Sequence, residues 1–100
     1  MPGFVQVMEF DTKRIDEVDA LARELEGELG GDFLARRATT TADRDRPGHY
    51  YVIVEFDSYE EAMRNSENPV IANYSEKMAG LVDGDVTFHN LDVMSVMDRR

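Results

Sequence analysis

The chain has 100 residues, which is enough for one domain, spanning residues 1–100, but not for two. It contains no cysteine, which excludes disulfides, thiolate metal sites and cysteine nucleophiles. Acidic side chains outnumber basic ones by 21 to 11, and the formal net charge of −10 disfavours nucleic acids and anionic membranes as partners. The first ten residues do not form a signal peptide, and no apolar run approaches the ~18–20 residues needed to cross a bilayer. We therefore expect a soluble, cytoplasmic protein.

The first two predicted elements are a strand and a helix. Residues 4–10 contain β-branched and aromatic side chains, with apolar residues at both parities, so both faces of this strand should be covered. Residues 14–29 carry apolar side chains at helical spacing and acidic ones on the opposite side. Asp11 or Thr12 is expected to cap this helix, and the glycine pair that follows should end it.

Two further strands are predicted next. Residues 33–41 contain arginines and a run of threonines, which suit the edge of a sheet because they discourage pairing with other chains. A charged loop over residues 43–48 reverses the chain. Residues 50–56 are the most apolar strand, with Val52 and Val54 at one parity, and this strand should lie centrally in the sheet.

Two helices should follow the central strand. Ser58 begins a capping box, and its helix is expected to end near Asn65. Asn68 should cap a second helix with Pro69 at its first position, where the missing N–H costs nothing. We expect this second helix to end at residues 83–84.

The last predicted strand runs from about residue 86 to residue 97. Its apolar residues change parity halfway along, and a β-bulge near His89-Asn90 would place all four on one side. These four residues are Val86, Phe88, Leu91 and Val93. The far end of this strand is long enough to reach onto a partner subunit.

The order β-α-β-β-α-β predicts an α+β, ferredoxin-like fold, with an antiparallel four-stranded sheet and both helical segments on one face. The other face carries Tyr51, Ile53 and either Phe4 or Val5, which are too apolar to meet water. We therefore expect a homodimer, in which two sheets pair as a dimeric α/β barrel. Glu55 shares this face and should be paired, for example with an arginine across the dimer.

Three segments carry a family resemblance: the strand–helix junction VEFDSYEEAM, the helix NPVIANYSEKM and the closing FHNLDV. Together they resemble the antibiotic biosynthesis monooxygenase-like family of the dimeric α/β-barrel superfamily. Members of that family include cofactor-free oxygenases of polycyclic aromatic or quinol substrates, haem-degrading enzymes and isomerase-like proteins. The haem-degrading branch has a histidine on the later helix and a tryptophan in its pocket. Here NYSEKMAG has no histidine and the chain has no tryptophan, so the resemblance implies no haem.

Six residues are candidates for contacting a ligand: His49, Tyr51, Tyr59, Asn65, Tyr74 and His89. By this resemblance, four residues are of types that the quinol oxygenases of the family use: Arg37, Tyr59, Asn65 and Tyr74. His89 is the weak catalytic candidate, because an imidazole can deprotonate a phenol near neutral pH. Each candidate also has a structural alternative: a histidine bonded to the backbone, or a tyrosine packed in the core or an interface. The two histidines lie on strands separated by another strand, so we expect no shared metal.

Two functions therefore stay open. The first is a homodimeric monooxygenase-like protein that binds a small apolar or aromatic molecule between sheet and helices, and oxidises a phenol or quinol with O₂ without a cofactor. The second is a non-catalytic ligand-binding or accessory dimer. The sequence has no phosphate-binding loop, nucleophile elbow or metal-ligand spacing that would point to another chemistry.

Overall fold

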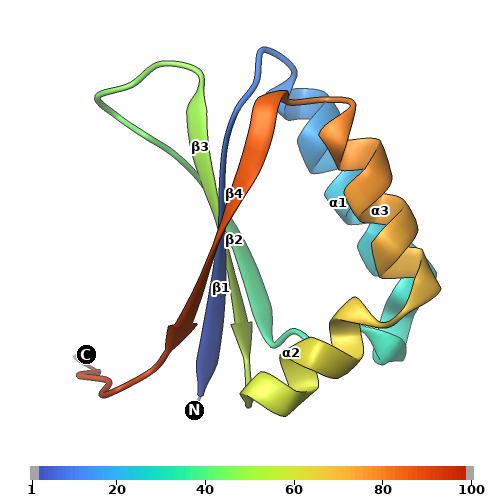
Figure 1. The fold of residues 1–100 in the computed structure, drawn as a ribbon, viewed down its shortest axis with the longest axis vertical. Helices are drawn as coiled ribbons and strands as arrows, with labels where there is room; N and C mark the ends of the chain where they lie inside the picture. The colour runs from blue at the N-terminus through green and yellow to red at the C-terminus, as the bar shows by residue number, and fades with distance from the viewer. Residues whose placement is uncertain (1–2, 99–100) are drawn as a thin grey trace.

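The computed structural model describes residues 3–98. Its four strands form one antiparallel sheet in the order β2-β3-β1-β4, and Figure 1 shows all the helices on one side of it. The elements in chain order are β1 (Phe4–Asp11), α1 (Ile15–Leu29), a short 3-10 helix (Gly30–Asp32), β2 (Arg37–Ala42), β3 (His49–Phe56), α2 (Tyr59–Ser66), α3 (Pro69–Ala79) and β4 (Asp83–Asp92). The predicted α+β, ferredoxin-like fold is confirmed, with β1 and β3 at the centre.

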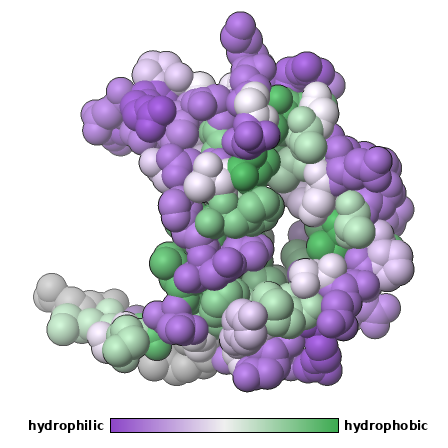
Figure 2. Space-filling view, viewed as in Figure 1, coloured by the Kyte–Doolittle hydropathy of each residue, from purple (hydrophilic) through white to green (hydrophobic). Residues whose placement is uncertain are grey.

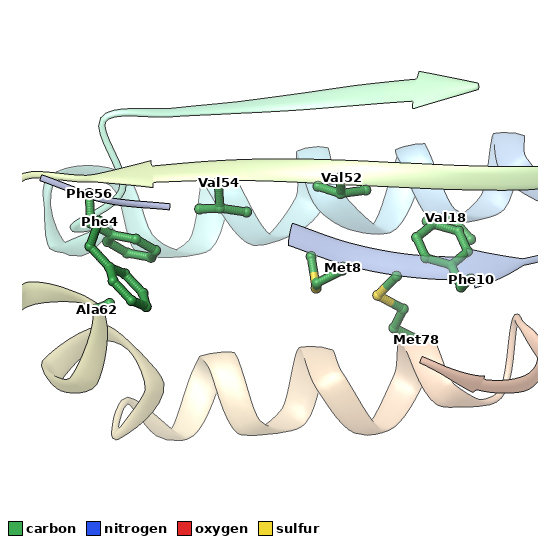
Figure 3. Packing of buried hydrophobic residues seen from close by; sticks show 9 residues of the cluster. All are labelled: Phe4, Met8, Phe10, Val18, Val52, Val54, Phe56, Ala62 and Met78. Carbon is green, nitrogen blue, oxygen red and sulfur yellow. The ribbon is translucent and has the colours of Figure 1, made fainter. Parts of the chain in front are cut away.

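Strand alternation gives the sheet two different faces. Successive side chains of a strand point to opposite sides, so one parity of β1 and β3 meets the helices and the other does not. We call these the inner face and the outer face. The inner face forms the core with residues of the helices, and Figure 3 shows these side chains between the strands and α2 and α3. The buried cluster consists of Phe4, Met8, Phe10, Val18, Val52, Val54, Phe56, Ala62 and Met78.

Two capping interactions determine where α2 and α3 begin. The Ser58 hydroxyl oxygen accepts a hydrogen bond from the Glu61 amide at 3.1 Å, which is one half of the predicted capping box, whereas the Glu61 carboxylate accepts from Arg64 instead. The Asn68 side-chain oxygen accepts from the Val70 amide at 2.9 Å, with proline at the next position. Both predicted caps are confirmed. The Asn68 cap begins a new helix just after α2 ends, so the helical region is divided in two. α2 lies across one end of the sheet (Figure 1).

The start of α1 differs from its prediction. Neither Asp11 nor Thr12 caps the helix, because β1 continues to Asp11 and the helix begins only at Ile15. Thr12 is buried and serves another purpose. Its hydroxyl accepts a hydrogen bond from the Arg14 amide at 3.0 Å and donates one to the Leu81 carbonyl at 2.6 Å. This side chain therefore joins the start of α1 to the segment that follows α3.

The predicted bulge near His89-Asn90 is wrong. The pairing of β4 with β1 is continuous over residues 87–92, and its register shifts only nearer the start of β4, opposite residues 9–11 of β1. The physical reason is that the apolar residues of β4 serve both faces of the sheet. Phe88 lies opposite Met8 on the inner face, whereas Leu91 lies opposite Val5 on the outer face.

Three other element boundaries differ from their predictions. α3 ends at Ala79, not at residues 83–84, because Asp83 already pairs with β1 as the first residue of β4. β2 begins at Arg37 rather than at residue 33. β4 ends at Asp92, so residues 93–98 lie outside any strand. No helix in residues 3–98 is long and apolar enough to cross a membrane.

Candidate functional site

A cavity of about 510 Å³ lies between the inner face of the sheet and the helices. Figure 2 shows it as an opening between the sheet and the helical layer. Its volume falls within the ~300–1,000 Å³ that is usual for small-molecule pockets. The sheet contributes Gln6, Met8, Ala38, Thr40, Val52, Val54, Phe56 and Phe88. The helices and the segment after α1 contribute Val18, Asp19, Ala22, Arg23, Leu25, Glu26, Phe33, Ala62, Asn65, Ser66, Ile71, Tyr74 and Ser75.

Two polar side chains of this lining are partly or fully buried, and one of them is held by a hydrogen bond. Asn65 is buried near the end of α2, and its side-chain oxygen accepts a hydrogen bond from the Leu34 amide at 3.4 Å. The contact directs the oxygen toward the backbone, and the amide NH₂ group is a hydrogen-bond donor. Tyr74 is half-buried on α3, and its burial raises the pKa of the phenol above 10.0. The Tyr74 hydroxyl therefore stays protonated at neutral pH and can donate a hydrogen bond.

Among residues 3–98, the charged side chains that line the cavity all come from α1. Arg23 donates a hydrogen bond to the Asp19 carboxylate at 3.0 Å, and Glu26 lies further along the same helix. None of the described residues that line the cavity is a histidine or a lysine. The acid–base groups available to a bound molecule are therefore the Tyr74 phenol and the carboxylates of Asp19 and Glu26.

The six predicted ligand residues fall into different places. Asn65 and Tyr74 line the cavity. Tyr59 is 51% exposed on α2, where its ring packs edge-on against Phe4 at 5.3 Å between ring centroids, outside the cavity lining. The other three, which are His49, Tyr51 and His89, have the parity of the outer face. The structure thus brings together two of the six at the cavity and groups three on the opposite side of the sheet.

Those outer-face histidines belong to a hydrogen-bonded cluster that crosses three strands. His49 lies 2.7 Å from the Asp11 carboxylate through Nδ1 and 2.7 Å from the Glu9 carboxylate through Nε2. The second oxygen of Glu9 lies 2.9 Å from Nε2 of His89. The His49 ring is buried and meets Tyr51 edge-on, with 5.2 Å between ring centroids. We call Glu9, Asp11, His49 and His89 the histidine network.

Hydrogen bonding sets the protonation state of this network. Ionised carboxylates only accept hydrogen bonds, so an imidazole flanked by two of them satisfies both when it carries two protons. The bond to Asp11, followed by the bond to Glu9, raises the pKa of His49 above 6.5. The pKa of Glu9 is lowered below 4.5, first by the bond from His89 and then by the bond from His49.

Sequence reasoning missed Glu9 and Asp11. The signal that could have found them is parity: both residues share the parity of Val5 and Val7, and therefore their face, on a strand already predicted to lie centrally. Within residues 3–98, no group of three or more histidine, cysteine or acidic residues has the arrangement of a metal site.

Glu55 is paired, as predicted, but its partner differs from the expected one. The Arg37 guanidinium donates to both Glu55 carboxylate oxygens, at 2.6 and 3.5 Å. Arg37 belongs to the neighbouring strand β2 of the same chain, directly opposite Glu55 in the register. No partner subunit is therefore needed to neutralise this carboxylate.

Comparison with known proteins identifies the fold. No protein-family model matches the chain, and no curated protein matches its sequence. SnoaB from Streptomyces nogalater, a cofactor-independent oxygenase, superposes with a TM-score of 0.80 at 12% identity, over 99% of this chain and 100% of that one. An antibiotic biosynthesis monooxygenase gives 0.71 at 19% identity, over 92% and 99%. A conserved protein from Methanosarcina mazei gives 0.78 at 11% identity, over 92% and 93%. At these identities the similarity defines the fold rather than an activity. The chain has the fold of the antibiotic biosynthesis monooxygenase-like proteins.

Proposed function

We propose that the chain binds a small apolar or aromatic molecule in the cavity and oxidises a phenol or quinol there with O₂, without a cofactor. The observation that carries this proposal is a cavity of about 510 Å³ whose largely apolar walls hold Asn65 and Tyr74 as hydrogen-bond donors. Apolar walls with a few placed polar groups are the usual design of a small-molecule site. The fold likeness to SnoaB, a cofactor-independent oxygenase, supports the choice of chemistry.

Asn65 and Tyr74 suit the charge that develops in this reaction. A phenol must lose its proton before it gives up electrons readily, and the resulting oxyanion is stabilised by donors fixed in a site with little water. The Asn65 amide and the Tyr74 hydroxyl are such donors. His89 plays no part in this proposal, because it lies on the outer face; the proton goes to Asp19, to Glu26 or to solvent.

The rival function, a ligand-binding dimer without catalysis, is favoured by a different observation. The lining offers no imidazole, and the raised pKa of Tyr74 keeps the phenol protonated near neutral pH. A bound phenol would therefore have no buried base to accept its proton. Native mass spectrometry of the purified protein is expected to show a carried ligand under either function, whereas turnover is expected only under the first.

In both functions the protein is a cytoplasmic homodimer that pairs through the outer face. Val5, Val7, Ile53 and Leu91 share that face by register, and Leu91 is 48% exposed in the single chain. Pairing would remove this apolar surface from water. Light scattering tests the assembly, and a single species of 11.4 kDa at micromolar concentration would refute it.

The test of catalysis is incubation with a panel of hydroquinones, in air and without oxygen, followed by chromatography. Faster product formation with protein, dependent on O₂, is the expected result. Incorporation of ¹⁸O from labelled O₂ would identify monooxygenation, whereas H₂O₂ formation would identify two-electron oxidation. Equal product with and without protein would refute the enzymatic function and leave the binding function.

A matched pair of variants locates the site. Ala22 lines the cavity on α1, whereas Ala20 on the same helix is exposed and does not. Ala22→Phe should fill part of the cavity and abolish ligand retention and any turnover. Ala20→Phe, which adds the same ring on the solvent side, should leave both unchanged. Equal retention in both variants would place the ligand elsewhere.

A further inference from the structure

We propose that the histidine network makes the pairing of two copies depend on pH: the outer faces bind one another while His49, held between two carboxylates, is protonated, and separate when it is not. This inference rests on the homodimer of the proposed function, and it assigns a role to a cluster that the cavity does not use. The occupant of the outer face is a second copy of this chain.

The first support is the geometry around His49. Both ring nitrogens lie 2.7 Å from carboxylate oxygens, and the ring itself is buried. A neutral imidazole has one N–H, so deprotonation removes one of these two hydrogen bonds and leaves a nitrogen lone pair facing a carboxylate. The imidazolium form therefore satisfies both contacts, whereas the neutral form satisfies only one.

The second support is the charge of the whole outer face. Paired strand positions give this face three groups that carry or can carry positive charge: Arg37, His49 and His89. The same positions give it four carboxylates: Glu9, Asp11, Glu55 and Asp83. With both histidines protonated the signs nearly balance, and with both neutral Arg37 alone opposes the four carboxylates.

This balance favours a second copy as the partner. Each chain carries a formal charge of −10, so two copies repel one another over most of their surfaces. On the outer face that repulsion is reduced, because Arg37, His49 and His89 interleave with its carboxylates beside apolar residues. A two-fold pairing places this face against itself, which a mixture of both signs permits and a uniformly acidic face does not.

Residues 93–98 lie on the same side of the sheet. After β4 the chain turns away from the helices (Figure 1), and Figure 2 shows apolar atoms projecting there. Met94 and Met97 are 92% and 89% exposed. Large apolar side chains with this exposure are suited to covering a second copy that is seated on the outer face.

Pairing should strengthen the preference for protonated histidines. When two outer faces meet, water leaves the network, and the uncompensated carboxylates of a neutral network become more costly. The paired state therefore binds protons more tightly than the single chain. By linkage, the dissociation constant of the pair rises with pH in the range where His49 loses its proton.

Three other charged groups lie near the network. Arg46 and Asp43, in the loop between β2 and β3, influence His49 and Tyr51, and Asp83 lies opposite Asp11 in the register. The chain has two histidines and no cysteine, and both histidines belong to the network.

The experiment is sedimentation velocity over a concentration series at about pH 6 and about pH 9, at constant ionic strength. A dissociation constant at least about tenfold higher at the upper pH is expected, because each proton taken up on pairing contributes up to one log unit per pH unit. Glu9→Gln, which removes the carboxylate shared by both histidines, should flatten this dependence. Glu76→Gln, the same change at an exposed position on α3, should leave it intact.

A second measurement does not depend on any variant. The ¹⁵N shifts of the His49 ring in the wild-type protein should show both nitrogens protonated at about pH 7. A neutral His49 ring at that pH would overturn the inference. So would a pair whose dissociation constant is equal at both pH values, or a Glu9→Gln variant that keeps the full dependence; the homodimer would then stand without a switch. A monomer at both pH values would refute the homodimer and this inference together.

Discussion

The two faces of one sheet differ in almost every property that matters for function. The inner face is apolar and borders a cavity of about 510 Å³, with Asn65 and Tyr74 as its placed polar groups. The outer face carries an ordered chain of carboxylates and imidazoles with no helix over it. Adjacent residues of β3 serve opposite faces: Tyr50 packs against the core, and Tyr51 contacts the histidine network. A strand period of two is thus enough to separate a ligand site from an assembly surface.

The largest effect should come from truncating aromatic residues on the two faces. Phe10 is 1% exposed on the inner face, and Phe10→Ala should lower the free energy of unfolding by about 3–5 kcal/mol. Tyr51→Ala on the outer face should cost clearly less in the dilute chain, because Tyr51 is only half-buried. Urea denaturation measures both. The Tyr51 cost should grow with protein concentration if the outer face pairs, and equal costs at all concentrations would break the comparison.

The second prediction concerns the pH dependence of folding stability, to which the histidine network of the outer face should contribute. The pKa of His49 is raised in the fold, so its stabilisation is complete below pH 6.5 and is lost as the pH rises through the folded value. The pKa of Glu9 is lowered, so its stabilisation is present above pH 4.5 and is lost as the pH falls through the folded value. The network should therefore stabilise the wild type most between pH 4.5 and pH 6.5, and its contribution to the melting temperature should be largest there.

Glu9→Gln is the variant that checks this pH dependence. It removes a partner of both histidines, so the melting temperature should fall near pH 6 and change less with pH on either side. The control Glu76→Gln should keep the wild-type profile, because Glu76 is exposed on α3. A profile for Glu9→Gln that parallels the wild type would show that the network does not set the pH dependence of folding.

The sequence predicted the inner face better than the outer one, and the reason is physical. Apolar periodicity and the caps at Ser58 and Asn68 are local signals, and they fix the sheet order and the helical layer that enclose the cavity. The histidine network depends on register across three strands, which no local pattern determines. The bulge expected near His89 shows the same weakness: all apolar residues of β4 were assigned to one face, whereas Phe88 and Leu91 serve different faces.

The third prediction tests which tyrosine a ligand contacts. Tyr74→Phe removes only a hydroxyl from the cavity, so ligand affinity should fall by about 0.5–1.5 kcal/mol if that hydroxyl donates a hydrogen bond. Tyr51→Phe removes the same group from the outer face and should leave affinity unchanged. Isothermal titration with a bound phenol, or displacement of a carried ligand, measures the difference. A larger loss for Tyr51 would move the ligand to the outer face.

The most local effect should come from a helix cap that shapes the inner side alone. Ser58→Ala removes the hydroxyl that accepts from the Glu61 amide, and N-cap losses of this kind cost about 0.5–2 kcal/mol. α2 carries Asn65 and Ala62 to the cavity but contributes nothing to the outer face. Backbone amide shifts should therefore move around α2 and the cavity while those of Glu9, His49 and His89 stay in place, because the sheet between them is rigidly paired. Shifts that spread equally to both faces would show that the two surfaces are coupled through the sheet, and ligand binding would then be expected to influence the pairing of the two copies.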